Sequence, residues 1–314
     1  MLIGAKGQLS LTLAKHLQTL DCDVTGIVQV TSSVRDLEPL GLFKSIESID
    51  LSNPKECWNL LDRIQPNSIF HFAGVHGGRN SMMNSIRERS TDMVSTHLTI
   101  TSNILEWQRF NKFISSHFAL SSQMYSVGSN GDIFIDENSK EEPVNFYGET
   151  KLLARRLIQK YRQKYDISAN GYILFNNASL HTKPGFLISD LAAKILLLIK
   201  NPSLAKTVFV KNSRVDISVA KDFCDAILMC DRSKIVGDFV LGSNRSIQVD
   251  EIIDSVFLDL ELSNRIRPQL IDVKENLLIS NTSKIRDLTG WRPHRKINEV
   301  ICGIIKREEW MSRE

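Results

Sequence analysis

Short apolar runs alternate with longer stretches of helical periodicity along the first part of the chain. Runs rich in branched apolar residues predict strands, and apolar residues that recur every three or four positions predict helices. The pattern predicts strands at residues 1–3, 23–29, 68–73, 112–120 and 168–174, and helices at residues 9–20, 54–64, 83–110 and 147–165. This alternation implies right-handed crossovers, and therefore a doubly wound parallel sheet of the α/β class with helices on both faces.

The pattern becomes less regular after residue 175. Helical periodicity returns at residues 188–199, 219–229, 249–260 and 297–311. We therefore expect a larger lobe formed by residues 1–175 and a smaller lobe formed by residues 176–314, with the return of some later elements to the sheet left open. The polar stretch at residues 126–144 predicts a loop within the larger lobe, and loops of that length often carry function.

Composition and charge narrow the class of protein. The 314 residues are 42% apolar and 24% charged, which is typical of a globular chain. The 39 basic and 36 acidic residues leave a net charge of +3, which argues against nucleic acid or an anionic membrane as the main partner. The five cysteines form no C-x-x-C pair, and neither a membrane-spanning run nor a signal peptide is recognisable. These features predict a cytoplasmic protein.

A glycine-containing turn follows the first predicted strand and opens the first predicted helix. It reads Gly4-Ala-Lys-Gly7-Gln-Leu-Ser10, which is the context that a dinucleotide fingerprint requires. The glycines let the backbone approach a pyrophosphate, whose charge the helix N-terminus then holds. The third position, where Gly or Ala is usual, is Ser10. A strand-to-helix turn without a ligand stays the alternative.

The end of the second predicted strand bears on the type of dinucleotide. Residues 29–35 contain hydroxyl groups and Arg35, but no Asp or Glu that could bind a free ribose diol. Hydroxyls and an arginine suit a 2'-phosphate better than a diol, so the sequence favours NADP, with NAD left open. A solvated loop is the alternative reading for Arg35.

Three polar residues predict proton-transfer chemistry. Tyr147 and Lys151 lie four positions apart on a predicted helix, which places both side chains on one face. A cation there favours the phenolate, so we expect a lowered Tyr147 pKa and proton exchange with a substrate hydroxyl or ketone during hydride transfer. Ser121 ends the strand predicted at residues 112–120, and ligands bind at the carboxyl ends of parallel strands. Ordinary strand capping is the alternative for Ser121.

In their order and spacing, these motifs resemble the extended short-chain dehydrogenases of the nucleotide-sugar epimerase and dehydratase group, and within it the GDP-mannose 4,6-dehydratases. The resemblance implies a Rossmann-type cofactor lobe, a smaller C-terminal lobe that binds a nucleotide sugar, transient oxidation at the sugar C4, and a homodimer or tetramer. It rests on residues 4–7, 26–33, 50–51, 71–74, 121–125, 147–151, 174–179, 220–222 and 290–293.

The resemblance assigns a role to each candidate site residue. The catalytic residues are expected to be Ser121, Gln123, Tyr147 and Lys151. The substrate-binding residues are expected to be Ser122, Asn176, Asn177 and Arg214. The cofactor-binding residues are expected to be Gly4, Gly7, Gln8, Leu9, Ser32, Arg35, Asp50, Leu51, Ala73, Gly74, Tyr147 and Lys151. No metal site is expected, because His71, His76 and His97 are too irregularly spaced.

The chain departs from the dehydratase pattern where it matters for the reaction. Gln123 stands where the dehydratases carry a Glu that serves as acid and base for the C5 proton, and an amide cannot take that proton. An acidic substrate contact of the family is matched by Ala178, and the arginines that follow it by His181 and Thr182. A further arginine is matched by Val215, with Arg214 next to it.

Hydride transfer at C4, of the epimerase or reductase type, is therefore the predicted reaction. Two alternatives stay open. A 4,6-dehydratase would need another base for C5, for which the loop offers Asp136, Glu137, Glu141 and Glu142. A non-catalytic cofactor-binding or scaffold protein would leave the Tyr147 and Lys151 pair unexplained.

Overall fold

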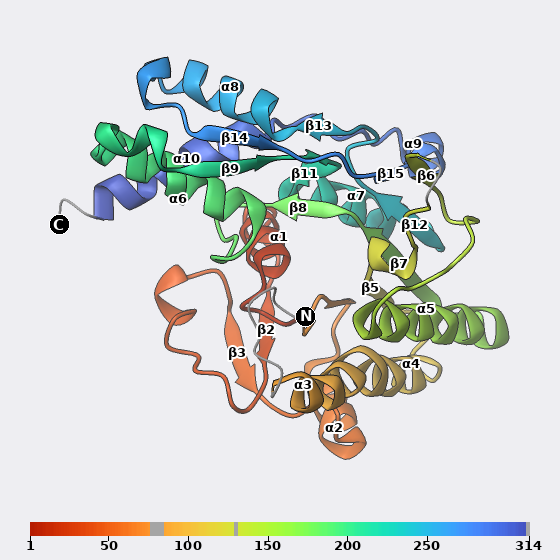
Figure 1. Cartoon of the computed structure of the whole chain (residues 1–314). Helices are drawn as coiled ribbons and strands as arrows, with labels where there is room; N and C mark the ends of the chain where they lie inside the picture. The colour runs from red at the N-terminus through yellow and green to blue at the C-terminus, as the bar shows by residue number, and fades with distance from the viewer. Residues whose placement is uncertain (76–84, 129–130, 312–314) are drawn as a thin grey trace.

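The computed structural model of the chain describes residues 1–75, 85–128 and 131–311 (Figure 1). Within these residues, seven parallel strands form one central sheet in the order β12–β7–β5–β4–β1–β2–β3. The strands are β1 (Leu2–Ile3), β2 (Thr25–Val28), β3 (Ser45–Ser48), β4 (Ser68–His71), β5 (Ser115–Ser121), β7 (Ser168–Leu174) and β12 (Asp238–Leu241). The predicted doubly wound α/β fold is confirmed.

Successive strand residues point to opposite faces of the sheet, so each face has its own core. Ile3, Ile69 and Ile173 pack on the face covered by α2 (Pro54–Ile64), α4 (Ile100–Gln108) and α5 (Phe146–Tyr165). Their neighbours Leu2, Phe70 and Tyr172 pack on the face covered by α1 (Gln8–Gln18), α7 (Ala220–Arg232) and α9 (Ser283–Thr289). Strands buried on both faces explain the near-continuous apolar runs of the sequence.

Helix termini follow local signals in the sequence. Asn53 caps α2 by accepting from the backbone N–H groups of Lys55 and Glu56, and Pro54 occupies the first helical position. Asn145 caps α5 in the same way through the Gly148 N–H. The helix predicted at residues 83–110 is divided into α3 (Ser85–Val94), the π-helical turn η2 (Ser95–Thr99) and α4, while residues 83 and 84 lie outside the described residues.

A second core lies in the later part of the chain. It is formed by α6 (Leu187–Lys200), α8 (Val249–Asp259) and α10 (Ile297–Met311) with the short strands β8 (Asn176–Ala178), β9 (Phe209–Asn212), β11 (Ile217–Val219) and β14 (Gln269–Asp272). Between these elements, α7 and β12 return to the central sheet (Figure 1). The division of the chain at residue 175 stays a prediction.

The loop predicted at residues 126–144 contains a short strand, which corrects that prediction. Within it, β6 (Ile133–Ile135) pairs in parallel with β15 (Leu278–Ser280). The partner strand is far away in sequence, so no local sequence pattern predicts the pairing. The remaining short elements are η1 (Glu38–Leu40), η3 (Ser122–Met124), η4 (Pro202–Lys206), η5 (Asn264–Ile266), β10 (Arg214–Val215) and β13 (Ile247–Gln248).

Candidate active site

A cavity of about 1040 Å³ opens at the carboxyl ends of the central strands, where parallel sheets bind ligands. Of the residues predicted for the site, every one except Arg35 lines it. These are Gly4, Gly7, Gln8, Leu9, Ser32, Asp50, Leu51, Ala73, Gly74, Ser121, Ser122, Gln123, Tyr147, Lys151, Asn176, Asn177 and Arg214. The Arg35 side chain is exposed and is not among the lining residues, so its cofactor contact stays a prediction.

The glycine turn is a tight cradle between β1 and α1. Gly4 has a φ of +84°, and a Cβ there would lie 2.6 Å from the Ala73 Cα, so only glycine fits. A Cβ on Gly7 would lie 3.2 Å from the Gly4 carbonyl oxygen. Helix α1 begins at Gln8 without a side-chain cap, which leaves its first N–H groups for an anion. The turn therefore fits a diphosphate, and the small Ser10 is fully buried at the packing position behind it.

The Ser121, Tyr147 and Lys151 side chains meet at this cavity. A hydrogen bond joins Ser121 and Tyr147, and the Lys151 ammonium lies 5.8 Å from the centre of the Tyr147 ring. Lys151 is buried and donates to the Ala119 carbonyl oxygen at 2.8 Å. Burial lowers the pKa of Lys151 to about 7.

The expected lowering of the Tyr147 pKa is wrong for this structure. Burial raises the pKa of Tyr147 to about 12, although the Ser121 hydrogen bond lowers it. The Lys151 ammonium lies beside the ring and binds a backbone carbonyl, so desolvation of the phenolate dominates. Tyr147 is consequently a protonated phenol at neutral pH.

His97 belongs to the site, although sequence spacing gave no reason to place it there. It lies on the π-helical turn η2, and its ring meets the edge of the Tyr147 ring with the centroids 5.3 Å apart. Its Nε2 accepts from the Val75 N–H at 3.3 Å, and its Nδ1 lies 2.8 Å from the Thr150 hydroxyl. His97 thus links the cavity-lining segment after β4 to the helix that carries Tyr147. A π-helical turn is often found at functional sites.

The other histidines considered for a metal site have separate positions. His71 Nε2 lies 2.9 Å from the Thr96 carbonyl oxygen, and burial, with the nearby charge of Lys151, lowers the pKa of His71 to about 3. His76 lies outside the described residues.

Gln123 is anchored to the start of α5, the helix that carries Tyr147 and Lys151. Its Oε1 accepts from the Asn145 side-chain amide at 3.0 Å, while the Asn145 Oδ1 caps α5 by accepting from Gly148 N at 2.8 Å. Gln123 therefore takes part in the hydrogen bonding that fixes the start of the helix carrying Tyr147.

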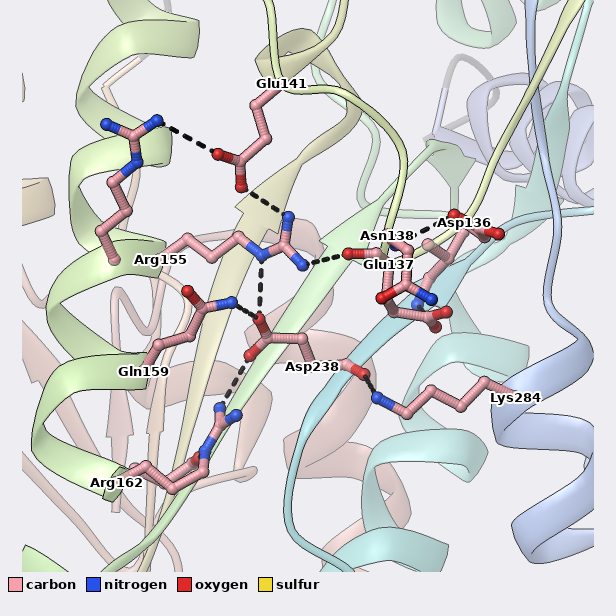
Figure 2. A network of polar contacts seen from close by, with 12 residues as sticks. Asp136, Glu137, Asn138, Glu141, Arg155, Gln159, Arg162, Asp238 and Lys284 are labelled. Atoms are coloured by element: carbon pink, nitrogen blue, oxygen red, sulfur yellow. Dashed lines mark hydrogen bonds and ion pairs between the residues drawn. The ribbon is translucent and has the colours of Figure 1, made fainter. Parts of the chain in front are cut away.

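None of the four loop carboxylates proposed as a substitute base lines the cavity. Glu137 accepts from the Val240 N–H at 2.8 Å, and Glu141 accepts from Arg155 at 2.7 Å (Figure 2). Among the described residues, the carboxylates in the lining are Asp50 and Asp216. Asp216 is already bound by the N–H and hydroxyl groups of Ser243 and Ser280.

Arg155 is the centre of a polar network that includes the Glu141 carboxylate and the Glu137 backbone (Figure 2). It lies one turn after Lys151 on α5 and is 4% exposed. Its guanidinium donates to the Asp238 carboxylate at 2.8 Å, to Glu141, to the Glu137 carbonyl oxygen at 2.6 Å and to the Tyr125 hydroxyl at 3.2 Å. Arg155 thereby joins α5 to β12, to the loop that precedes α5 and to the turn that carries Gln123.

Three of the four predicted substrate residues, Asn176, Asn177 and Arg214, are already engaged in the fold. Asn176 donates to the Asp216 carbonyl oxygen at 3.0 Å, and Asn177 receives the Gln8 side-chain amide. Arg214 forms a bidentate pair with Asp132, with its two terminal nitrogens 2.7 and 2.8 Å from the carboxylate oxygens. A ligand phosphate would have to compete with Asp132 for this guanidinium.

The glycine cradle and the Ser121, Tyr147 and Lys151 cluster, on a parallel sheet with a second core beside it, define a member of the extended short-chain dehydrogenase class. The model of the GDP-mannose 4,6 dehydratase family matches residues 1–303. The chain therefore belongs to this family of nucleotide-sugar dehydratases and epimerases. GDP-mannose 4,6 dehydratase 1 of Arabidopsis thaliana is 23% identical over 327 residues, which cover 96% of this chain and 87% of that relative.

Solved structures share the fold at low identity. A UDP-glucose-4-epimerase from Stenotrophomonas maltophila, solved with NAD and formylated UDP-arabinopyranose, has a TM-score of 0.79 and 15% identity, covering 99% of this chain and 98% of that one. The RMD protein of Pseudomonas aeruginosa, solved with NADPH, has a TM-score of 0.73 and 17% identity, covering 100% and 99%. Among the described helices, none combines the length and the apolar character needed to cross a membrane.

Proposed function

We propose that the chain transfers a hydride at C4 of a nucleotide-linked sugar, as an epimerase or a reductase does, with Tyr147 as the acid and base. The observation that carries this proposal is the meeting of Ser121, Tyr147 and Lys151 in the cavity that also contains the glycine cradle. A scaffold protein would have no use for a buried lysine one turn from a buried phenol.

The geometry gives each residue a task. Ser121 and Tyr147 are hydrogen-bonded to each other, so both hydroxyls can reach one substrate oxygen, where Tyr147 exchanges the proton and Ser121 holds the oxygen. The family resemblance implies that Lys151 binds the ribose of the nicotinamide. A bound nicotinamide supplies or accepts the hydride. Because the Tyr147 phenol is protonated at neutral pH, it is poised to donate to a keto sugar that is being reduced.

Elimination is the second candidate reaction, because the family match favours a 4,6-dehydratase. The site argues against it. An amide stands at Gln123, the loop carboxylates do not line the cavity, and Asp216 is bound by two serines. The other lining carboxylate, Asp50, accepts from the N–H and hydroxyl groups of Ser52 and lies where the adenine of the cofactor is expected, so neither lining carboxylate is suited to remove the C5 proton.

Incubation of the matched nucleotide sugar in deuterated water separates the two reactions. We expect reduction or epimerisation at C4 by mass and NMR spectra, without loss of water and without deuterium at C5. Elimination followed by hydride delivery to C6 would instead lose water and place deuterium at C5. Efficient loss of water by the unchanged chain would overturn the proposed reaction in favour of the dehydratase.

We propose NADP(H) as the cofactor. Ser32, which follows β2, and Lys6, which lies in the glycine turn, both line the cavity. The first acidic residue after β2, Asp36, is exposed and paired with Lys6 at 2.8 Å. A hydroxyl and an ammonium suit a 2'-phosphate, whereas a free diol calls for a carboxylate. Calorimetric titration should show tighter binding of NADP(H) than of NAD(H). Binding of neither cofactor would favour the scaffold alternative.

The nucleotide and the oligomer are proposals of the same kind. GDP-, CDP-, UDP- and dTDP-sugars can be screened by thermal shift, because a ligand of the folded state raises its stability.

We propose a homodimer or tetramer built on α4 and α5, and exposed Phe146 and Leu153 on α5 support it. Light scattering after size exclusion should give a mass of at least two chains.

A further inference from the structure

The Gln8 side chain connects the glycine cradle with the opposite wall of the cavity. Gln8 is the first residue of α1, and its Nε2 donates to the Asn177 carbonyl oxygen at 3.0 Å and to the Asn177 Oδ1 at 3.1 Å. Its Oε1 lies 2.8 Å from the Thr182 hydroxyl, which shares its one proton between Gln8 and the Ser179 carbonyl oxygen, also at 2.8 Å. Both ends of the amide are therefore used, which fixes its orientation.

The residues that receive Gln8 belong to a firmly built segment. Asn177 lies in β8, which pairs with β11. The Thr182 hydroxyl also accepts from the Ser179 N–H at 2.9 Å, and the Ser179 hydroxyl accepts from the His181 N–H at 3.1 Å. Residues 176–178 and 181–183 line the cavity on the side expected to hold the nucleotide sugar. Movement of α1 would thus be passed directly to the substrate wall by the Gln8 side chain.

We propose that Gln8 is a positioning residue that couples cofactor binding to nucleotide-sugar binding. The proposal rests on the proposed function, because it needs a dinucleotide at the α1 N-terminus. The first N–H groups of α1 take the diphosphate, and the Gln8 side chain leaves the helix at that same turn. Fixing the turn also fixes Asn177 and Thr182, so the second ligand meets a wall that is already ordered.

The fold does not depend on this connection. Leu9, Leu13 and Ala14 of α1 pack with Phe223 and Ile227 of α7 in one buried core. Helix α7 directly follows β11, and β11 pairs with β8. Helix α1 and β8 are therefore joined a second time through apolar packing (Figure 1). Removal of the Gln8 amide should leave the chain folded.

Calorimetry with NADP+ and GDP as probes tests the coupling, with UDP in place of GDP if it binds tighter. The measured quantity is the ratio of the nucleotide Kd without and with saturating NADP+, which does not depend on either affinity alone. We expect a ratio of about ten in the unchanged chain, within the usual range of coupling between sites. In Gln8→Met the ratio should fall several-fold toward one, because the direct polar connection between the glycine turn and the substrate wall is lost while the apolar packing through α7 remains.

Matched variants separate the connection from general damage. Gln18→Met changes the same residue type at the other end of α1, where the Gln18 amide donates to the Gly41 carbonyl oxygen, and should keep the ratio. Thr182→Val should lower the ratio, and Thr182→Ser, which keeps the hydroxyl, should restore it. A ratio that persists in Gln8→Met, or an equal loss in Gln18→Met, overturns the proposal.

The outcomes also separate this proposal from the proposed function. An unchanged chain that binds neither NADP+ nor NAD+ would overturn both. If the chain binds a cofactor but neither nucleotide, the coupling is tested by measuring amide hydrogen exchange in the presence and absence of the cofactor. Protection of residues 177–183 on cofactor binding, lost in Gln8→Met, supports the connection. If the cofactor adds no protection to these residues in the unchanged chain, the proposed coupling through Gln8 is refuted, although cofactor binding itself is confirmed.

Discussion

Arg155→Met should destabilise the chain more than the same change at the neighbouring Arg156. Arg155 is buried and donates to Asp238, Glu141, Tyr125 and the Glu137 backbone (Figure 2). Methionine keeps most of the aliphatic length but removes every donor. The substitution therefore leaves buried acceptors without their shared cation.

The expected loss follows from what remains around each acceptor. Breaking a buried ion pair by removing one partner costs roughly 3–5 kcal/mol. Here the Asp238 carboxylate keeps Arg162 at 2.7 Å and Gln159 at 2.6 Å, and Glu141 keeps Arg156 at 3.3 Å. The free energy of unfolding should therefore fall by about 3 kcal/mol, at the lower end of that range.

Urea unfolding, followed by tryptophan fluorescence and circular dichroism, gives the difference by linear extrapolation. Arg156→Met is the matched control, since the Arg156 side chain also pairs with Glu141 but is 61% exposed. Its loss should stay below about 1 kcal/mol. Because Lys151 lies one turn before Arg155, cofactor affinity measured by calorimetry should also weaken more in Arg155→Met than in the control.

Two results would contradict this reasoning. Equal losses in Arg155→Met and Arg156→Met would mean that burial of the network adds nothing. Strict additivity of Arg155→Met and Asp238→Asn would mean that the two residues do not interact, because residues in one network show a coupling free energy of about 0.5–3 kcal/mol.

Three other changes test the site and the fold. Tyr147→Phe should lower turnover by about two orders of magnitude or more in steady-state kinetics, the usual contribution of a general acid or base, while Lys151→Ala should also weaken cofactor binding in calorimetry. Ser32→Asp should shift the calorimetric preference from NADP+ toward NAD+, because a carboxylate binds the free diol and repels the 2'-phosphate. Burial raises the pKa of Asp231, but the His117 and Ser68 hydrogen bonds outweigh it and bring that pKa from 3.8 to about 2. A folded-state pKa below the unfolded one stabilises the fold above about pH 4 by roughly 2 kcal/mol, and this is lost as the pH falls toward about 2. Asp231→Asn should remove that part of the pH dependence in urea unfolding.

The sequence predicted five of the seven strands of the sheet from local periodicity, but it missed β3 (Ser45–Ser48) and β12 (Asp238–Leu241), whose four-residue runs are too short to show a period. It also predicted which segments surround the cavity, since strand ends and the glycine turn are read directly from the chain. The pairing of β6 with β15 and the return of β12 to the sheet depend on partners far away in sequence. Their short apolar runs carry no sign of which strand they will join.

Side-chain positions within the site were the part that spacing could not give. The four-residue spacing of Tyr147 and Lys151 placed both on one face of α5, but the Lys151 ammonium binds the Ala119 carbonyl oxygen. The direction of the Tyr147 pKa shift was therefore wrong. His97 was missed because its contacts with Val75 and Thr150 span 22 and 53 residues.

Gln123 has a structural role as well as a proposed chemical one. A substitution that keeps the structural role can test whether the chain can act as a dehydratase without disturbing α5. As a sequence position it is the loss of a base, but in the fold its oxygen accepts from Asn145, which caps α5. In Gln123→Glu a carboxylate oxygen would still accept from Asn145, and a negative charge near the α5 N-terminus is favourable. The substitution should therefore keep Tyr147 in place while adding the missing base. If Gln123→Glu gains the ability to eliminate water and Gln123→Met does not, the barrier to elimination lies at this one side chain. No gain with cofactor binding intact would mean that the altered substrate wall around Ala178 and His181 also prevents elimination.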